Sequence, residues 1–201
     1  MNCNEIVKKA ERHIRELYQE HLRPEFVYHN LEHVERVVKL SGQIADHYTL
    51  ERMEVESVFV AAWFHDTGYL FSSNEHEEKS AQLAVSFLKQ EKADNGLVKK
   101  VKECILATKI FKKSASLSAE IVSDADLFHL GTTDFWDTNK RMKEEMELRF
   151  GKEIPSWQWN EGALRLLIRH RFETDYCQAL LQEGKQKNID LLREWLMKNA
   201  I

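Results

Sequence analysis

The sequence predicts an all-α protein. Only 7 glycines and 2 prolines occur among its 201 residues, so few positions can interrupt a helix. Apolar residues recur at intervals of three and four, the spacing of one face of an α-helix, and no alternating apolar–polar run is longer than a few residues. Hydrophobic residues make up 43% of the chain, which is enough for a sizeable core in one domain.

The N-terminal half divides into helices at recognisable signals. Residues 4–21 are predicted to form an amphipathic helix that ends before Pro24. A second helix is expected from an N-cap at Asn30 to about residue 48, and a third over about 51–65. The chain is then expected to turn at Gly68, where backbone freedom is needed.

The remaining helices follow from similar signals. The loop 69–75 leads into a long helix, and a further helix follows the break at 94–96. A basic, serine-rich loop over 109–118 precedes the helix that carries Asp126, which is expected to end near Gly131. Charged, heptad-like helix is predicted for the rest of the chain, with Trp157 and Trp159 in a turn marked by Pro155.

An imidazole and a carboxylate, His65 and Asp66, end the apolar run 58–64. Burying either group without a partner costs several kcal/mol. A divalent metal ion satisfies both together, because it binds a neutral imidazole nitrogen and an ionised carboxylate. The pair therefore suggests a metal site.

Two further polar residues in apolar surroundings complete a possible ligand set. His33 lies within 28–38, and Asp126 lies within 121–127, each beside the predicted core-facing stripe of its helix. Two histidines and two carboxylates from three helices could surround a metal and leave positions for water or substrate.

In this order the residues resemble the HD-domain family of metal-dependent phosphohydrolases, whose signature is His, then His-Asp, then Asp on an all-helical core. The resemblance covers about residues 28–131, with local similarity at 74–81 and 124–131. It implies an HD-domain helical bundle with additional C-terminal helices, in a single domain over 1–201 with a core of about 25–131 and a helical extension of about 132–201. The metal ligands implied by the resemblance are His33, His65, Asp66 and Asp126.

The resemblance also implies an activity. The expected reaction is hydrolysis of a small phosphorylated metabolite, with a nucleotide favoured, by attack of water bound to the metal on phosphorus. Asp66 is the candidate for orienting that water. Two alternatives stay open: a metal-containing module that binds a nucleotide or partner protein without turnover, and a di-iron oxygenase of the HD fold, which would need more histidines.

Asp124 and Asp126 both remain possible as the last ligand. The family's ligand usually follows alanine, which favours Asp126. Asp124 is then expected to act as a helix N-cap or to accept a hydrogen bond from one of the metal ligands.

His76 is the only histidine between Asp66 and Asp126, so the usual dinuclear ligand set of the family is incomplete. One tightly bound divalent metal is expected, with Mn, Fe, Co, Ni, Zn and Mg all open. His76 is expected to contact substrate, water or a weak second ion, and a solvated histidine near a helix start is the alternative. His29 and Lys109 are the expected substrate contacts, and Lys79, Arg169 and Arg171 are further cations to consider. The alternative for each of these cations is a solvated surface charge, and for His29 it is an ordinary residue at the N-terminus of a helix.

Composition limits the partners. A formal net charge of −4 argues against a nucleic-acid polymer as partner. No apolar stretch approaches the length that spans a membrane, and the N-terminus lacks signal-peptide character. The 3 cysteines are scattered and are expected to be reduced thiols, which predicts a cytoplasmic protein. The oligomeric state is not readable.

The other histidines are assigned no role in the chemistry. Solvent-exposed positions are expected for His13, His21 and His47, and a surface cluster is expected around His170. His129 is expected to pack beside the Asp126 ligand.

Overall fold

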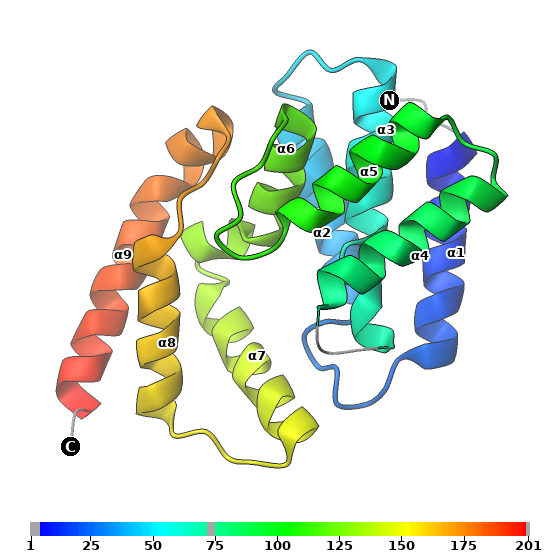
Figure 1. The fold of residues 1–201 in the computed structure, drawn as a ribbon. Coiled ribbons are helices and arrows are strands. Elements are labelled where there is room, and N and C mark those ends of the chain that lie inside the picture. The colour runs from blue at the N-terminus through cyan, green and yellow to red at the C-terminus, as the bar shows by residue number, and fades with distance from the viewer. Residues whose placement is uncertain (1–4, 72–74, 200–201) are drawn as a thin grey trace. The chain divides into compact units, whose positions relative to one another are not determined.

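The computed structural model describes residues 5–71 and 75–199, and within these ranges it contains helices and no strands (Figure 1). The predicted all-α class is therefore confirmed. The α-helices are α1 (Glu5–His21), α2 (Leu31–Ala45), α3 (Arg52–Phe64), α4 (His76–Gln90), α5 (Asn95–Ala107), α6 (Leu117–Asp126), α7 (Phe135–Phe150), α8 (Ser156–Arg169) and α9 (Asp175–Asn199). Two 3₁₀ helices, η1 (Thr67–Leu70) and η2 (Phe128–Gly131), connect α3 to α4 and α6 to α7.

The chain divides into two compact units. The first comprises the described parts of Met1–Arg23 and His29–Asp126, and the second comprises Pro24–Tyr28 and the described part of Leu127–Ile201. The single-domain layout implied by the resemblance stays a prediction.

Helix α3 is the centre of the first unit. It is apolar around most of its circumference, and its last seven residues, 58–64, are all apolar. A helix with this pattern has to be enclosed on all sides, and α3 packs against α1, α2, α4, α5 and α6. Val58, Val60 and Phe64 are fully buried. This enclosure brings the end of α3, where His65 and Asp66 follow, into the interior.

Most predicted helix boundaries lie within a few residues of those observed. Residues 4 and 72–74, parts of the predicted first helix and of the loop 69–75, lie outside the described residues. One boundary was wrong: α6 ends at Asp126, and a separate 3₁₀ helix continues to Gly131. Asp124 consequently lies in the last turn of a helix and cannot be its N-cap.

Gly68 is required by a close approach rather than by an unusual backbone conformation. The only glycine with a positive φ among the described residues is Gly151, so the predicted need for backbone freedom at Gly68 was wrong. A Cβ atom at Gly68 would lie 2.0 Å from the backbone oxygen of His76. Glycine therefore allows η1 to pack directly against the first turn of α4.

In the second unit, α9 packs against η2 and α8. A Cβ atom at Gly184 of α9 would lie 2.0 Å from the backbone oxygen of Gly131. The Asn188 side chain, one turn further on, donates hydrogen bonds to the carbonyl oxygens of Leu130 (3.0 Å) and Thr132 (2.9 Å). The backbones of α9 and η2 are therefore in direct contact at this point.

Gly184→Ala is expected to destabilise the protein by about 3 kcal/mol, because a methyl group at this contact meets backbone that cannot rotate away. For a chain of this length, that corresponds to a fall in Tm of roughly 6–12 °C. Gly162→Ala in α8 is the matched control, since its Cβ would meet nothing within 4 Å. In Gly162→Ala, the higher helix propensity of alanine should stabilise the protein by up to about 1 kcal/mol. Equal melting temperatures for the two variants would contradict the close contact.

Several side chains lie elsewhere than expected. Trp157 and Trp159 lie within α8, which begins directly after Pro155, because proline is tolerated at a helix start. His13 is not solvated but half-buried, with its ring stacked on those of Phe64 (5.9 Å) and Phe87 (5.0 Å).

His170 was predicted in a surface cluster but is buried. Its carbonyl oxygen accepts a hydrogen bond of 2.7 Å from the buried ammonium group of Lys185. Burial, and then the charge of Lys185, lower the pKa of His170 to about 3. The His170 ring is therefore uncharged at neutral pH and packs in the interior of the second unit.

Among the described cysteines, Cys104 and Cys177 are buried and form no disulfide, and burial raises the pKa of the Cys104 thiol to about 12. Cys3 lies outside the described residues. The described helices include none with the length and apolar character needed to cross a membrane.

Candidate metal centre

His65 is held at the end of α3 by its own helix. Its Nδ1–H donates a hydrogen bond of 2.8 Å to the carbonyl oxygen of Ala62, one turn earlier. In the neutral ring this leaves the lone pair on Nε2, which is the form that binds a metal. The neutral form of His65 is therefore held in the tautomer and orientation of a ligand.

The segment that carries Asp66 is fixed by buried hydrogen bonds of the two residues that follow it. The Thr67 hydroxyl donates to the carbonyl oxygen of Phe64 at 2.7 Å. The backbone N–H of Gly68 donates to the Ser80 hydroxyl of α4 at 2.8 Å. These contacts lock the turn that follows α3, and so they set the direction of the Asp66 side chain.

His33 and Asp126 come from the ends of two other helices. The backbone N–H of His33 donates to the Asn30 side chain at 3.2 Å, which confirms Asn30 as the N-cap of α2 and places His33 in the first turn. Asp126 is the last residue of α6. The three helix ends thus supply all four side chains.

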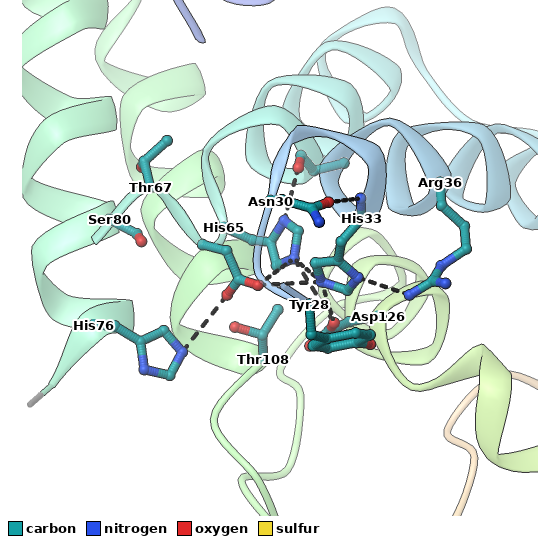
Figure 2. Close-up of polar contacts among 12 residues, drawn as sticks. Tyr28, Asn30, His33, Arg36, His65, Thr67, His76, Ser80, Thr108 and Asp126 are labelled. Atoms are coloured by element: carbon teal, nitrogen blue, oxygen red, sulfur yellow. Dashed lines mark hydrogen bonds and ion pairs between the residues drawn. The ribbon is translucent and has the colours of Figure 1, made fainter. Parts of the chain in front are cut away.

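The four side chains predicted as ligands converge. One ligand atom from each of His33, His65, Asp66 and Asp126 lies within 4.8 Å of the others. Figure 2 shows the rings of His33 and His65 turned toward each other, with their Nε2 atoms 3.2 Å apart. The Asp66 and Asp126 carboxylates lie 3.1 and 3.3 Å from His33 Nε2. Asp124 is buried nearby in sequence but is not part of this cluster.

The cluster is chemically suited to a divalent metal. The Oδ2 atom of Asp66 is buried, and within the described part of the chain it accepts no hydrogen bond. It lies 3.1 and 3.3 Å from the Nε2 atoms of His33 and His65. A buried carboxylate oxygen facing two imidazole nitrogens is costly unless a cation lies among them. Two imidazoles and two carboxylates are also a donor set that first-row divalent ions accept.

The close packing of these groups shifts their pKa values. Burial works against the charged form of His65, but the Asp66 and Asp126 carboxylates outweigh it and raise the pKa of His65 to about 9. Burial likewise opposes ionisation of Asp66, but the charge on His65 and the imidazole of His33 hold its pKa well below the usual value. The pKa of Asp126 is lowered in the same way. Without a metal, one proton on His65 partly balances two carboxylates.

His76 and His29 lie at the edge of the cluster. His76 Nε2 is 3.6 Å from Asp66 Oδ1, and burial is the main cause that lowers the pKa of His76. The Tyr69 ring contacts both histidines, with ring centroids 3.9 Å from His76 and 4.2 Å from His29. His29 precedes α2 rather than forming part of it. The structure therefore places both histidines beside the ligand set.

Lys109 is engaged elsewhere. Its ammonium group forms an ion pair with Glu78 of α4, and this hydrogen bond raises the pKa of Lys109 and lowers that of Glu78. The ammonium group of Lys79 lies over the Phe71 ring, 5.8 Å from its centroid. Arg169 and Arg171 belong to the second unit. A substrate contact by Lys109 stays a prediction.

Sequence reasoning missed Arg36 and Tyr69. The guanidinium group of Arg36 lies 3.0 Å from His33 Nδ1. The signal was present, since a residue three positions after His33 shares its helix face. Tyr69 carried a weaker signal, because a turn residue gives no periodic indication of its direction.

Comparison with known proteins agrees with this geometry. A family model described as HD domain matches residues 30–131, a range that contains the entire ligand cluster. No curated protein matches the sequence.

Three solved structures have a similar fold. A protein from Lactobacillus plantarum is 14% identical with a TM-score of 0.71, and the match covers 98% of each chain. The Lin1889 protein from Listeria innocua is 16% identical with a TM-score of 0.63, covering 96% of this chain and 95% of that one. A structure described as a predicted HD superfamily hydrolase, from an uncultured Thermotogales bacterium, is 17% identical with a TM-score of 0.61, covering 95% of this chain and 91% of that one. With the family model spanning half of the sequence, the chain belongs to the HD-domain family.

Proposed function

We propose that the protein is a metal-dependent phosphohydrolase that acts on a small phosphorylated metabolite, with a nucleotide favoured. The observation that carries this proposal is the cluster of two imidazoles and two carboxylates, of which all but Asp126 are buried, with an Asp66 oxygen that accepts no hydrogen bond from the described residues. A divalent ion held by His33, His65, Asp66 and Asp126 would polarise a phosphoryl oxygen and lower the pKa of a bound water.

The chain's own residues would position the reactants. Asp66 offers one oxygen to the cluster, while its other oxygen lies 3.6 Å from His76 Nε2. Asp66 and His76 together can therefore orient a water molecule at the edge of the cluster. Because burial lowers the pKa of His76, its ring is neutral at neutral pH and suits accepting a proton rather than donating one.

The substrate is proposed to enter past His29 and His76. The Tyr69 ring contacts both imidazoles, and each of them lies near a ligand, His29 near His33 and His76 near Asp66. His29 is proposed as a substrate contact, and Lys109 would serve as one only by leaving Glu78. The net charge of −4 argues against a nucleic-acid polymer as the substrate.

Phosphate release by the reconstituted protein tests the proposal. The protein is stripped with a chelator, loaded separately with each candidate ion, and screened against nucleotides and simple phosphoesters. We expect release that depends on the ion and stops when the chelator is returned. Stoichiometric metal and nucleotide binding without release would favour a binding module. Oxygen consumption with an iron-dependent optical signal would favour an oxygenase, and either result would overturn the proposal.

A further inference from the structure

A cavity of about 320 Å³ lies within the second unit. It is lined by η2, by the helices α7 and α8, which Figure 1 shows joined by a loop, and by a residue of that loop. Its walls are mainly apolar side chains: Leu130, Phe135, Met142, Ile154, Trp159 and Leu166. Proteins bind small molecules in cavities of about 300–1,000 Å³ with walls of this kind. The described lining includes none of the metal ligands.

The indole ring of Trp159 is a fixed wall of this cavity. Its N–H group donates to the side-chain and the backbone oxygen of Asn139, at 2.8 and 3.1 Å. The side-chain nitrogen of Asn139 donates in turn to the side-chain oxygen of Asn160 at 3.1 Å. Both asparagines are buried, so this chain of hydrogen bonds holds the indole in one orientation. A wall that is already positioned reduces the cost of ordering the site around a ligand.

Gly162 of α8 leaves room in the cavity. It lines the cavity, and a Cβ atom added to it would meet nothing within 4 Å. Its φ is not positive, so neither the backbone nor a close approach requires glycine here, in contrast to Gly184. Glycine inside a helix is nevertheless less favourable than alanine. The missing side chain therefore contributes open space rather than stability.

The volume of the cavity sets the size of its ligand. An apolar cavity of about 150 Å³ in another protein binds one benzene molecule. The cavity of about 320 Å³ is roughly twice as large and accommodates two fused rings. Phe135 and Trp159 are aromatic walls, against which a flat aromatic body packs well.

Arg165 determines the charge of the ligand. Among the described residues that line the cavity, it is the only arginine, lysine, aspartate or glutamate. Its guanidinium group is exposed and lies 3.1 Å from the exposed carboxylate of Glu161, one turn earlier on α8. Exposed pairs of this kind are weak, so Arg165 can exchange Glu161 for a carboxylate on a ligand and donate two hydrogen bonds to it. A cation beside apolar walls is complementary to an anion with an apolar body.

We propose that this cavity binds a small aromatic carboxylate of about two rings. The rings pack against Trp159 in the space that Gly162 leaves open, and the carboxylate pairs with Arg165. Binding at this site requires no divalent ion, and the inference does not rest on the proposed function.

The test is calorimetry on the metal-free protein in the presence of a chelator, which prevents a carboxylate from binding through a metal. The probe is 2-naphthoate, and 2-naphthylmethanol is the matched probe with the same rings and no charge. We expect 2-naphthoate to bind with a Kd of about 1 mM or lower, and 2-naphthylmethanol to bind more weakly.

Two variants separate the roles of charge and space. Arg165→Gln should weaken binding of 2-naphthoate about fivefold and leave 2-naphthylmethanol unaffected. Its control is Arg193→Gln on α9, where an exposed arginine likewise pairs with a carboxylate, that of Asp190, and neither affinity should change. Gly162→Leu should weaken both probes by at least about tenfold, because its side chain fills the cavity. It should melt no lower than wild type, since leucine has the higher helix propensity.

Three results would overturn the inference. They are no saturable binding of 2-naphthoate by the wild type, equal affinities in wild type and Gly162→Leu, and equal affinities for 2-naphthoate in wild type and Arg165→Gln. Dimerisation that Gly162→Leu abolishes, without binding of either probe, would make a second copy of the chain the occupant and would overturn it as well. Should Gly162→Leu fail to fold, Gly162→Ala gives the same comparison with one added carbon and a smaller expected loss.

Discussion

Replacing Asp66 with asparagine is expected to remove the bound metal and, with it, all phosphoester turnover. The substitution keeps the shape of the side chain but takes away the charge that faces His33 and His65. Loss of a residue that merely hydrogen-bonds to a metal ligand typically costs 10–100-fold in metal affinity. Loss of a ligand itself should therefore cost about 100-fold or more.

The fold of the Asp66→Asn variant should persist, because the turn around residue 66 is held by other groups. Thr67 and Gly68 make their hydrogen bonds to Phe64 and Ser80, neither of which is a ligand. Metal content by elemental analysis, turnover and circular dichroism are the three measurements. Asp46→Asn, at the exposed end of α2, removes the same charge as a control. Full metal occupancy in Asp66→Asn would contradict the assignment of Asp66 as a ligand.

The sequence was sufficient to predict the ligand cluster for a physical reason. Buried charges are rare, and His65 and Asp66 stand out because they follow seven apolar residues. His33 and Asp126 are found in the same way, as polar residues within apolar stripes. Helix periodicity was equally informative, because α3 and its neighbours carry strong apolar patterns.

Other features depend on contacts between segments distant in sequence. Gly68 reads as a turn residue, and only the packing of α4 shows that it permits a backbone contact with His76. His170 lies between two arginines in the sequence, but its environment is set by Lys185, fifteen residues later. Arg36 looked like one more charged residue on a helix surface. Only the direction of the His33 ring shows that its guanidinium group lies beside a ligand.

Loading the protein with a divalent metal is expected to raise its melting temperature, and to raise it more at higher pH. An ion present at about 1,000 times its Kd stabilises the folded state by about 4 kcal/mol. For a chain of about 200 residues, this corresponds to roughly 8–16 °C. The shift should be absent in Asp66→Asn, which keeps the same fold without the ligand.

The pH dependence follows from His65. In the metal-free protein its pKa is raised from 6.5 to about 9, so the ring is protonated at neutral pH and the metal has to displace that proton. Each unit by which the pH falls below 9 should therefore weaken metal binding about tenfold and reduce the stabilisation by about 1.4 kcal/mol.

The same His65 proton sets how the stability of the metal-free protein depends on pH. The raised pKa of His65 contributes stability that is fully present below the unfolded value of 6.5 and is lost as the pH rises through about 9. Thermal melts are recorded with Mn²⁺ and with a chelator, at about pH 6 and at about pH 8. The stabilisation by the metal should be larger at the higher pH by about 3 kcal/mol. Calorimetry in buffers of different ionisation enthalpy should show about one proton released per metal at neutral pH. A shift that is the same at both pH values, with no proton released, would mean that His65 is neutral in the metal-free cluster and that the two carboxylates are balanced by another group.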